Sequence, residues 1–342
     1  MKRLSGIVLL VVVALAAAAL GWAADRYRAN LDTPLALNQT DHFVLERGKG
    51  LRQVGQALAQ RGWVEDAWAV ELYGRRHNLD ARLQAGEYPV HPGTSVRELL
   101  HAMARGEVVQ YRITFPEGWG VAEMLRAVRR HPELRPPPES VGVHNLVDVL
   151  GLEDIEHPEG WFLPDTYFFA RGSDALDVLR RAHGAMQAAL AQAWAGRIDD
   201  HPVANAYELL ILASIVERET GRGDERDRVA GVFVNRLRRG MRLQTDPTLL
   251  YVQETGVQRL TRAELERDHP YNTYTRAGLP PTPIALPGRA ALEAAARPAR
   301  TDDLFFVSRG DGSHHFSETY REHREAVIRY QLGGNADRYG RR

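Results

Sequence analysis

Residues 205–221 read NAYELLILASIVERETG, and this stretch organises the rest of the chain. Its apolar residues fall on every side of a helix instead of along one stripe, which is typical of a helix buried all round. The spacing predicts a core helix over residues 204–220. The apolar residues are Leu209, Leu210, Ile211, Leu212, Ala213, Ile215 and Val216.

Carboxylates follow where this apolar run ends. The helix closes with ERETG (residues 217–221), in which Gly221 occupies the position expected of a C-cap. A carboxyl group at the negative end of a helix dipole, partly desolvated by the core, has a raised pKa and can serve as a general acid near neutral pH. The alternative is that Glu217 and Glu219 pair with neighbouring arginines on a solvated helix end.

The segments after this helix are rich in polar and aromatic side chains. A second helix is expected over residues 225–239, with Arg236, Arg238 and Arg239 on its solvated face. The loops near residues 241–247, 271–284 and 311–316 combine hydroxyls, amides and rings. Such groups suit a carbohydrate groove, because polar side chains bind sugar hydroxyls and flat rings cover sugar faces.

A small module precedes these segments. Strands are expected at residues 43–45, 86–90 and 108–115, and helices at residues 51–62, 65–76 and 94–106. A strand–helix–helix–strand order within about 70 residues describes a compact α+β module.

The larger part of the chain begins after Pro116. Further helices are expected at residues 121–130, 173–195 and 288–297, a loop at 131–140, and a buried strand at 304–307. The predicted fold class of the whole chain is therefore α+β.

The N-terminus has the composition of a membrane segment. Residues 6–24 are 19 residues without a charge, close to the about 20 that span a bilayer. Lys2 and Arg3 precede them, which predicts a cytoplasmic N-terminus with the bulk of the chain outside the cytoplasm. A cleaved signal peptide is the alternative, because the alanines at 16–19 and 23–24 offer small-residue cleavage sites.

Composition excludes several classes of protein. The chain has 342 residues, 44% of them hydrophobic, and 44 basic against 44 acidic residues give a formal charge of +0. That balance does not fit a nucleic-acid binder, and no phosphate-binding or dinucleotide-binding glycine motif is present. The absence of cysteine excludes thiol catalysis, cysteine-bound zinc and iron–sulfur clusters.

Five separated motifs resemble those of one enzyme family, the endolytic murein transglycosylases. They are EGWFLPDTY (159–167), SIVERET (214–220), ERDRVAGVFVNRLRRGMRLQTDPT (225–248), YNTYTRAGLPPTPIALPG (271–288) and LFFVSRGDGSHHF (304–316). The resemblance covers roughly residues 41–330. It differs from the family pattern at Leu286, where a small residue or Thr is expected, and at the paired His314 and His315, where one histidine is usual.

The resemblance implies a division of the chain into four parts. These are a cytoplasmic tip and transmembrane anchor (1–24), a linker (25–40), a LysM-like glycan-binding module (41–112) and a catalytic domain (113–342). The implied location is the cell inner membrane, with a single span and a periplasmic bulk. The implied partners are peptidoglycan strands and peptidoglycan synthases.

The resemblance also implies a mechanism that uses one carboxyl group. Glu219, the second glutamate of the Glu-x-Glu-Thr run, is the implied acid and base, with Glu217 as the fallback. It protonates the leaving glycosidic oxygen and then accepts the proton of the N-acetylmuramic acid 6-hydroxyl, which attacks its own anomeric carbon. No metal or cofactor is implied. The implied substrate-binding residues are Glu217, Gln244, Thr245, Asp246, Tyr271, Asn272, Thr273, Tyr274 and His314.

Three alternatives remain open at this stage. A muramidase-type hydrolase would need a second carboxylate, such as Asp246, to activate water. A non-catalytic peptidoglycan-binding scaffold would tolerate the loss of Glu219. A metal site could be built from His314, His315 and His323, although the sequence has no HExxH motif to support it.

Overall fold

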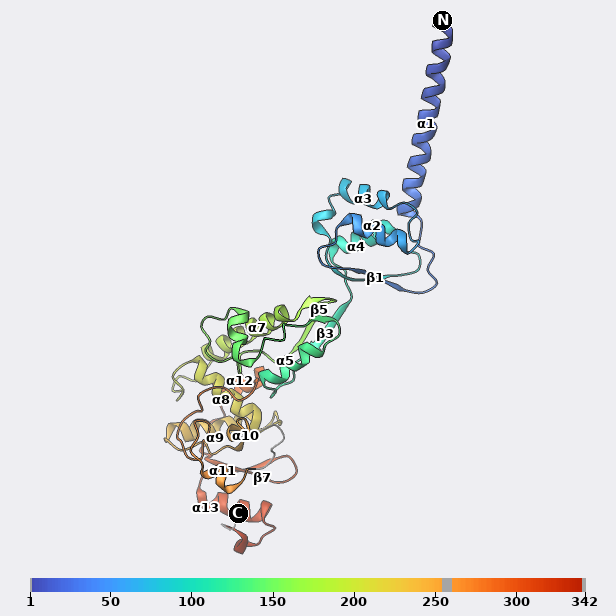
Figure 1. The fold of residues 1–342 in the computed structure, drawn as a ribbon. Helices are drawn as coiled ribbons and strands as arrows, with labels where there is room; N and C mark the ends of the chain where they lie inside the picture. The colour runs from blue at the N-terminus through green and yellow to red at the C-terminus, as the bar shows by residue number, and fades with distance from the viewer. Residues whose placement is uncertain (1, 254–259, 340–342) are drawn as a thin grey trace. The chain divides into compact units, whose positions relative to one another are not determined.

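A computed structural model describes residues 2–253 and 260–339 (Figure 1). The chain divides into two compact units. Unit 1 contains residues 1–111 and 168–173, and unit 2 contains residues 112–167 and 174–342. Both combine helices with short strands, so the predicted mixed α+β class is confirmed.

Unit 1 contains the strand–helix–helix–strand order expected from the sequence. β1 (Asp41–Leu45) pairs antiparallel with β2 (Gly86–Val90), with Asp41 opposite Val90 and Leu45 opposite Gly86. The rest of the unit is α2 (Leu51–Gln60), α3 (Ala67–Arg76), the 3₁₀ turn η1 (Asp80–Arg82), α4 (Val96–Arg105) and the start of β3 (Gln110–Thr114).

The core of unit 1 is built from the apolar faces of these elements. Phe43, Tyr73 and Tyr88 are its largest fully buried side chains. Residues 168–173 join this unit through Arg171, whose Nε donates a hydrogen bond of 2.5 Å to Glu87. A single boundary after residue 112 therefore does not divide the chain into the two units, because residues 168–173 return to unit 1.

The N-terminal helix is longer than expected. α1 (Lys2–Asp32) continues eight residues past Ala24 and ends beside the core, where Leu31 and Leu35 are buried. Residues 25–40, expected to form a linker, therefore complete a helix and help to close unit 1. The reason is tertiary: Asn30 Oδ1 accepts hydrogen bonds from the backbone N–H groups of Glu65 and Asp66, at 2.7 and 2.8 Å.

Unit 2 is mainly helical. Of the five helices expected here, α5 (Val121–Arg130) has its predicted bounds and the other four differ by no more than two residues at an end. The elements of unit 2 are α5, β4 (Leu134–Arg135), η2 (Val143–Asn145), α6 (Leu146–Leu150), β5 (Thr166–Ala170), β6 (Ser173–Asp174), α7 (Ala175–Ala195), α8 (Ala206–Glu219), α9 (Arg226–Arg238), α10 (Asp246–Leu250), α11 (Arg262–Glu266), α12 (Arg289–Ala296), β7 (Phe305–Ser308), β8 (His314–Ser317), α13 (Tyr320–Gln331) and η3 (Ala336–Arg338). Helices α6, α10, α11 and α13 were not predicted, and strand β8 lies partly in the stretch 311–316 that was expected to be a loop.

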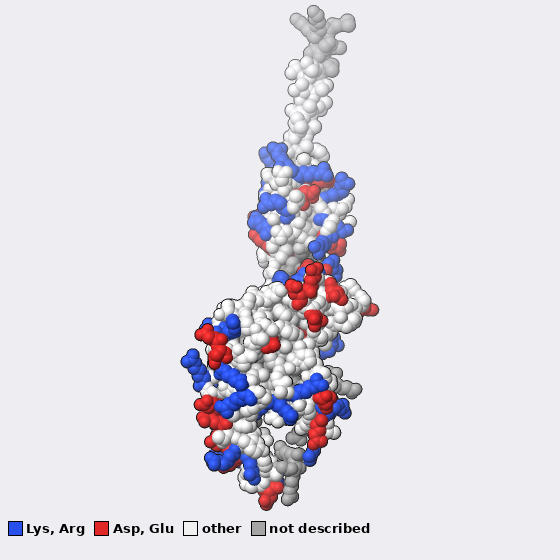
Figure 2. All heavy atoms as spheres, turned by 90° about the vertical axis from the view of Figure 1, so that its left-hand side faces the viewer, with Lys and Arg blue, Asp and Glu red and all other residues white. Residues whose placement is uncertain are grey.

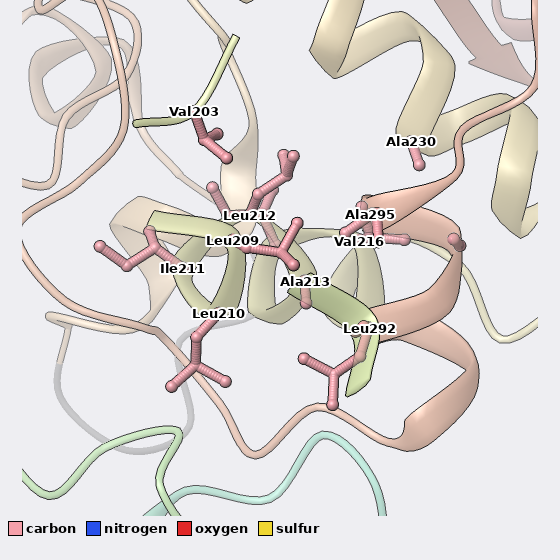
Figure 3. Close-up of a cluster of buried hydrophobic side chains, with 14 of the residues drawn as sticks. Val203, Leu209, Leu210, Ile211, Leu212, Ala213, Val216, Ala230, Leu292 and Ala295 are labelled. Carbon is pink, nitrogen blue, oxygen red and sulfur yellow. The ribbon is translucent and has the colours of Figure 1, made fainter. Parts of the chain in front are cut away.

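α8 lies at the centre of the unit 2 core, as its all-round apolar sequence predicts. Every residue from Leu209 to Val216 is buried, against side chains of α7, α9 and α12 (Figure 3). Asn205 caps the N-terminus by accepting a hydrogen bond from the Glu208 N–H at 2.9 Å. The C-terminus differs from the prediction. The cap is Thr220 in an extended conformation (φ −143°), not Gly221, so the chain leaves the helix immediately after Glu219.

Candidate active site

Glu219 is the last residue of α8, and its carboxyl group contacts the residue that precedes α10. Thr245 Oγ1 donates a hydrogen bond of 2.6 Å to Glu219 Oε1. Oε2 has no hydrogen-bond partner among the residues that the structure describes. The side chain remains partly accessible to solvent. One carboxyl oxygen is thus fixed, and the other is left for a proton and a substrate atom.

The surroundings of Glu219 favour its protonated form. Desolvation is the main cause and raises the pKa of this carboxyl, and the negative charge of Asp246 raises it further. The Thr245 hydrogen bond, His314 and Arg236 act in the opposite direction but do not reverse the shift. The direction agrees with the prediction from the sequence, and it is the direction that a general acid needs.

Two buried threonines, Thr248 and Thr273, hold Thr245 in place. The Thr245 N–H donates to Thr273 Oγ1 at 3.1 Å, the hydroxyls of Thr248 and Thr273 lie 3.0 Å apart, and Thr248 Oγ1 donates to the Thr245 carbonyl at 2.9 Å. This threonine cluster (Thr245, Thr248 and Thr273) joins the loop before α10 to the segment 271–274. Thr273 is only 2% exposed and supports Thr245, and its expected substrate-binding role stays a prediction.

Arg236 belongs to this support and not to the solvated face of α9 where the sequence placed it. Its side chain is buried. Nε donates to the Leu304 carbonyl and Nη1 to the Leu243 carbonyl, both at 2.7 Å. The pattern of α9 could not reveal this, because the partners are backbone groups outside the helix. Arg236 fixes the loop that carries Gln244 and Thr245.

Exposed polar groups adjoin Glu219 on the same loop. Tyr274 donates a hydrogen bond of 2.5 Å to Asp246 Oδ1, and Asp246 and Gln244 are both exposed. Gln244 has a φ of 48°, which costs a non-glycine residue about 1–2 kcal/mol. Strain of this size next to a proposed acid is typical of functional loops.

His314 lies in β8 and pairs with Glu225, the residue before α9. Its Nδ1 is 2.8 Å from Glu225 Oε2, and its backbone N–H also donates to that carboxylate. His323 instead stacks on the ring of Phe305, and His315 packs against the ring of Tyr330 at a tilt of 40°. Within residues 2–253 and 260–339, no three His, Asp or Glu side chains are grouped to hold a metal ion.

In the segment 271–274, Tyr271 and Asn272 are neighbours with different environments. Tyr271 is partly exposed and its hydroxyl lies 2.7 Å from Thr282 Oγ1. Asn272 is fully buried, its Nδ2 donates to the carbonyls of Leu265 and Arg267, and its Oδ1 accepts from the Tyr274 N–H. Asn272 therefore shapes the loop, and its expected substrate contact stays a prediction.

Glu217 lies away from the Thr245 side of α8. Two residues of helix turn a side chain by about 200°, so Glu217 and Glu219 project from different faces. Glu217 Oε2 accepts a hydrogen bond of 2.9 Å from the N–H of Gly288, the N-cap of α12. Burial raises the pKa of Glu217 as well. This geometry assigns Glu217 to α12 and not to the expected substrate contacts.

Glu159 is a buried carboxyl that the sequence reasoning did not single out, although it begins the motif EGWFLPDTY. It is 4% exposed and accepts hydrogen bonds from the Val121 N–H at 3.1 Å and from the Tyr251 hydroxyl at 3.3 Å. Desolvation raises its pKa to about 7. An acidic residue at the start of a motif otherwise rich in aromatic residues and proline was the available signal.

Comparisons with known proteins agree on one family. A family model described as the YceG-like family matches residues 43–329. The endolytic murein transglycosylase of Bacillus subtilis (strain 168) is 28% identical over 307 residues, which cover 85% of each chain. That of Streptococcus pneumoniae serotype 2 (strain D39 / NCTC 7466) is 25% identical over 319 residues, which cover 84% of this chain and 57% of the relative.

One solved structure is also similar. It is a yceG-like protein from Listeria monocytogenes, determined at 2.6 Å resolution, with 26% identity and a TM-score of 0.49. The match covers 84% of this chain and 99% of that one.

Proposed function

The chain belongs to the YceG-like family, and from this membership we propose that it is an endolytic murein transglycosylase with Glu219 as its acid and base. It is a lyase that cleaves the β-1,4 bond between N-acetylmuramic acid and N-acetylglucosamine within glycan strands. The observation that carries the assignment is the desolvated Glu219 carboxyl, held through one oxygen by Thr245.

The reaction needs one carboxyl group in two protonation states. Protonated Glu219 donates its proton to the glycosidic oxygen as the bond to the anomeric carbon breaks, and positive charge develops on the muramic ring. The resulting carboxylate then accepts the proton of the 6-hydroxyl of the same sugar as that oxygen bonds to the anomeric carbon. The enzyme ends in its starting state, and the product carries a 1,6-anhydromuramoyl end that terminates the strand.

The residues around Glu219 fit these steps. Thr245 orients the carboxyl, and its hydroxyl stabilises the carboxylate formed midway. Asp246 carries a negative charge close enough to influence Glu219, so it also stabilises the positive ring. Gln244, Tyr271, Tyr274 and His314 contact the sugars in this proposal.

A muramidase-type hydrolase is the second candidate, because Asp246 provides a second carboxylate near Glu219. In that case Asp246 would activate water, and the products would have reducing ends. The names of the relatives favour the transglycosylase. The end group of the product distinguishes the two reactions.

The test compares Glu219→Gln with Glu217→Gln on purified glycan strands, with mass spectrometry of the products. We expect wild-type protein to form anhydromuramoyl ends, and Glu219→Gln to lose roughly two to four orders of magnitude in rate, because the amide cannot donate the proton. Glu217→Gln should keep most of the rate. Reducing ends would assign a hydrolase, and near-normal turnover by Glu219→Gln would remove Glu219 from the mechanism.

The remaining assignments concern location and the first module. We propose a single inner-membrane span at about residues 6–24 of α1, with a cytoplasmic N-terminus. The helix Leu9–Asp32 is long and apolar enough to cross a membrane, and its apolar part ends at Ala24. In Figure 2 the described part of this helix outside the first folded unit is white, without the blue or red of charged side chains. Residues 41–112 are proposed as a LysM-like glycan-binding module, and peptidoglycan synthases as partners.

A further inference from the structure

Four apolar or aromatic side chains gather where α1 meets α3, and three of them are unusually exposed. Trp22 of α1 is 64% exposed, and Trp68 and Leu72 of α3 are 46% and 50% exposed. Tyr27 of α1 stacks on Trp68, with the ring centroids 6.2 Å apart. Scattered exposed apolar residues are ordinary, but adjoining ones mark a binding surface. We call these residues the α1–α3 face.

We propose that the α1–α3 face lies in the headgroup layer of the membrane, so that unit 1 rests on the bilayer as well as being tethered to it. This inference rests on the proposed insertion of α1. Its occupant is the lipid bilayer itself, because the face continues directly from the apolar helix that is proposed to span it.

The position of α3 relative to α1 is fixed by several contacts. Arg26 bonds to Asp66, with Nε 2.8 Å from Oδ2, and also to Glu65. Asn30 accepts from the backbone of the same two residues. Trp22, Arg26 and Asn30 recur every four residues, so they share one stripe of α1, and Arg26 covers the Trp22 ring at 5.1 Å.

The depth of the face agrees with that of the lipid headgroups. Tyr27 follows the last residue of the apolar run, Ala24, by three residues, which is about 4.5 Å along a helix. The headgroup region on each side of the hydrocarbon core is roughly 5–8 Å thick. Trp and Tyr are enriched at this level, where the ring is apolar and the polar edge reaches water. Tyr27 and Trp68, whose rings stack, therefore lie at this level. Trp22, two residues before Ala24, lies about 3 Å inside the edge of the hydrocarbon core.

The pattern of α3 is that of a helix with two apolar sides. Val70 and Tyr73 face the core, whereas Trp68 and Leu72, four residues apart, face outward and are followed on the same side by Arg75 and Arg76. Arginines next to exposed aromatic residues suit a surface of anionic lipid.

Three acidic side chains near this face are paired with arginines, and a fourth, Asp25, is exposed on α1 between Trp22 and Tyr27. Glu65 and Asp66 both pair with Arg26, and Glu71 pairs with Arg75 at 2.6 Å. The negative charges of these three side chains are therefore compensated by arginines.

The absence of cysteine permits a direct test with single labels in the full chain. Leu72→Cys, Val44→Cys and Leu15→Cys are each labelled with an environment-sensitive fluorophore. The protein is then reconstituted into vesicles of phosphatidylethanolamine and phosphatidylglycerol that contain lipid spin-labelled near the glycerol end. Val44 is the matched control, since it is 41% exposed on β1, which lies on the other side of unit 1 from α3 (Figure 1).

We expect the label at position 72 to be blue-shifted and quenched by the spin-labelled lipid, and the label at position 44 to be neither. Equal quenching and equal emission at positions 72 and 44 would overturn the inference. The label at position 15 reports α1 alone, because Leu15 lies within the apolar run. A blue-shifted label at position 15 with a water-exposed label at position 72 would refute only the placement of the α1–α3 face in the headgroup layer. Water-exposed labels at both positions would also refute the insertion of α1 into the membrane.

Discussion

At the scale of single residues, the Thr245 hydroxyl should control the pH range of activity. Its hydrogen bond to Glu219 favours the carboxylate, so Thr245→Val should raise the pKa of Glu219 and move the alkaline limb of the pH–rate profile to higher pH. The rate should also fall by roughly tenfold to a hundredfold, equivalent to about 1.5–3 kcal/mol for a hydrogen bond to a charged group.

The control for this prediction is Thr245→Ser, which retains the hydroxyl. It should restore the limb to its original pH, with a smaller loss of rate from looser packing in the threonine cluster. A Thr245→Val profile superimposable on that of the wild type would show that Thr245 supports the loop without acting on the acid.

Glu159 should make unit 2 less stable as the pH rises. Its folded pKa of about 7 lies above the ordinary glutamate value of 4.5, so folding favours the protonated carboxyl. This contribution is fully present below about pH 4.5 and is lost as the pH rises to about 7, a change of roughly 3 kcal/mol. Glu159→Gln is permanently neutral, so its free energy of unfolding should change less between about pH 5 and pH 8.

Denaturant unfolding of both proteins at the two pH values measures this difference. The amide keeps the size of the side chain, so comparable stability near pH 5 serves as the internal control. Parallel losses of stability in wild type and Glu159→Gln would mean that Glu159 does not take up a proton on folding.

The local signal, an apolar helix followed by carboxylates, indicated Glu217 and Glu219 alike, and the family resemblance chose Glu219, which stays a prediction. The sequence could not separate Gln244 and Asp246, which are exposed, from Asn272 and Thr273, which are buried. All four are polar loop residues, and only their partners elsewhere in the chain distinguish them. Arg236 was misplaced for the same reason.

At the scale of elements, close contact between α2 and α3 makes Gly55 sensitive to any side chain. A Cβ at Gly55 would lie 2.7 Å from the backbone oxygen of Ala67, which cannot move away cheaply. Gly55→Ala should therefore lower the free energy of unfolding by about 1–3 kcal/mol. The measurement is denaturant unfolding followed by circular dichroism.

Gly184 in α7 provides the matched comparison, because nothing lies within 4 Å of a Cβ there. Gly184→Ala should raise stability by about 0.5–1 kcal/mol through helix propensity alone. If Gly55→Ala also stabilised the protein, the close approach of the two helices would be wrong.

The elements themselves were largely predictable, because most are amphipathic and bounded by caps. α5 and β2 have their expected bounds, and the burial of α8 follows from its composition. The residues at which helices end were harder to predict. α1 extends to Asp32 because Asn30 meets the backbone before α3, and no local pattern in residues 25–40 carries that information.

At the scale of the whole molecule, the proposed topology predicts where a reporter is active. Fusion of alkaline phosphatase after residue 40 should give activity, because this enzyme folds only outside the cytoplasm, whereas a reporter that needs the cytoplasm should be silent there. The reverse pattern would invert the topology. A mature N-terminus near Ala24 would instead identify a cleaved signal peptide.

The unbroken helix between the apolar segment and unit 1 has a mechanical consequence. α1 has 31 residues, about 46 Å of helix, and its last turns are bound to the module by Arg26 and Asn30. With α1 in the bilayer, no flexible linker separates the membrane segment from unit 1 within the described residues. The helix then sets the distance of unit 1 from the membrane. The motions left to unit 1 are lateral diffusion and rotation about the helix axis. Unit 1 would therefore stay within one thin layer parallel to the membrane.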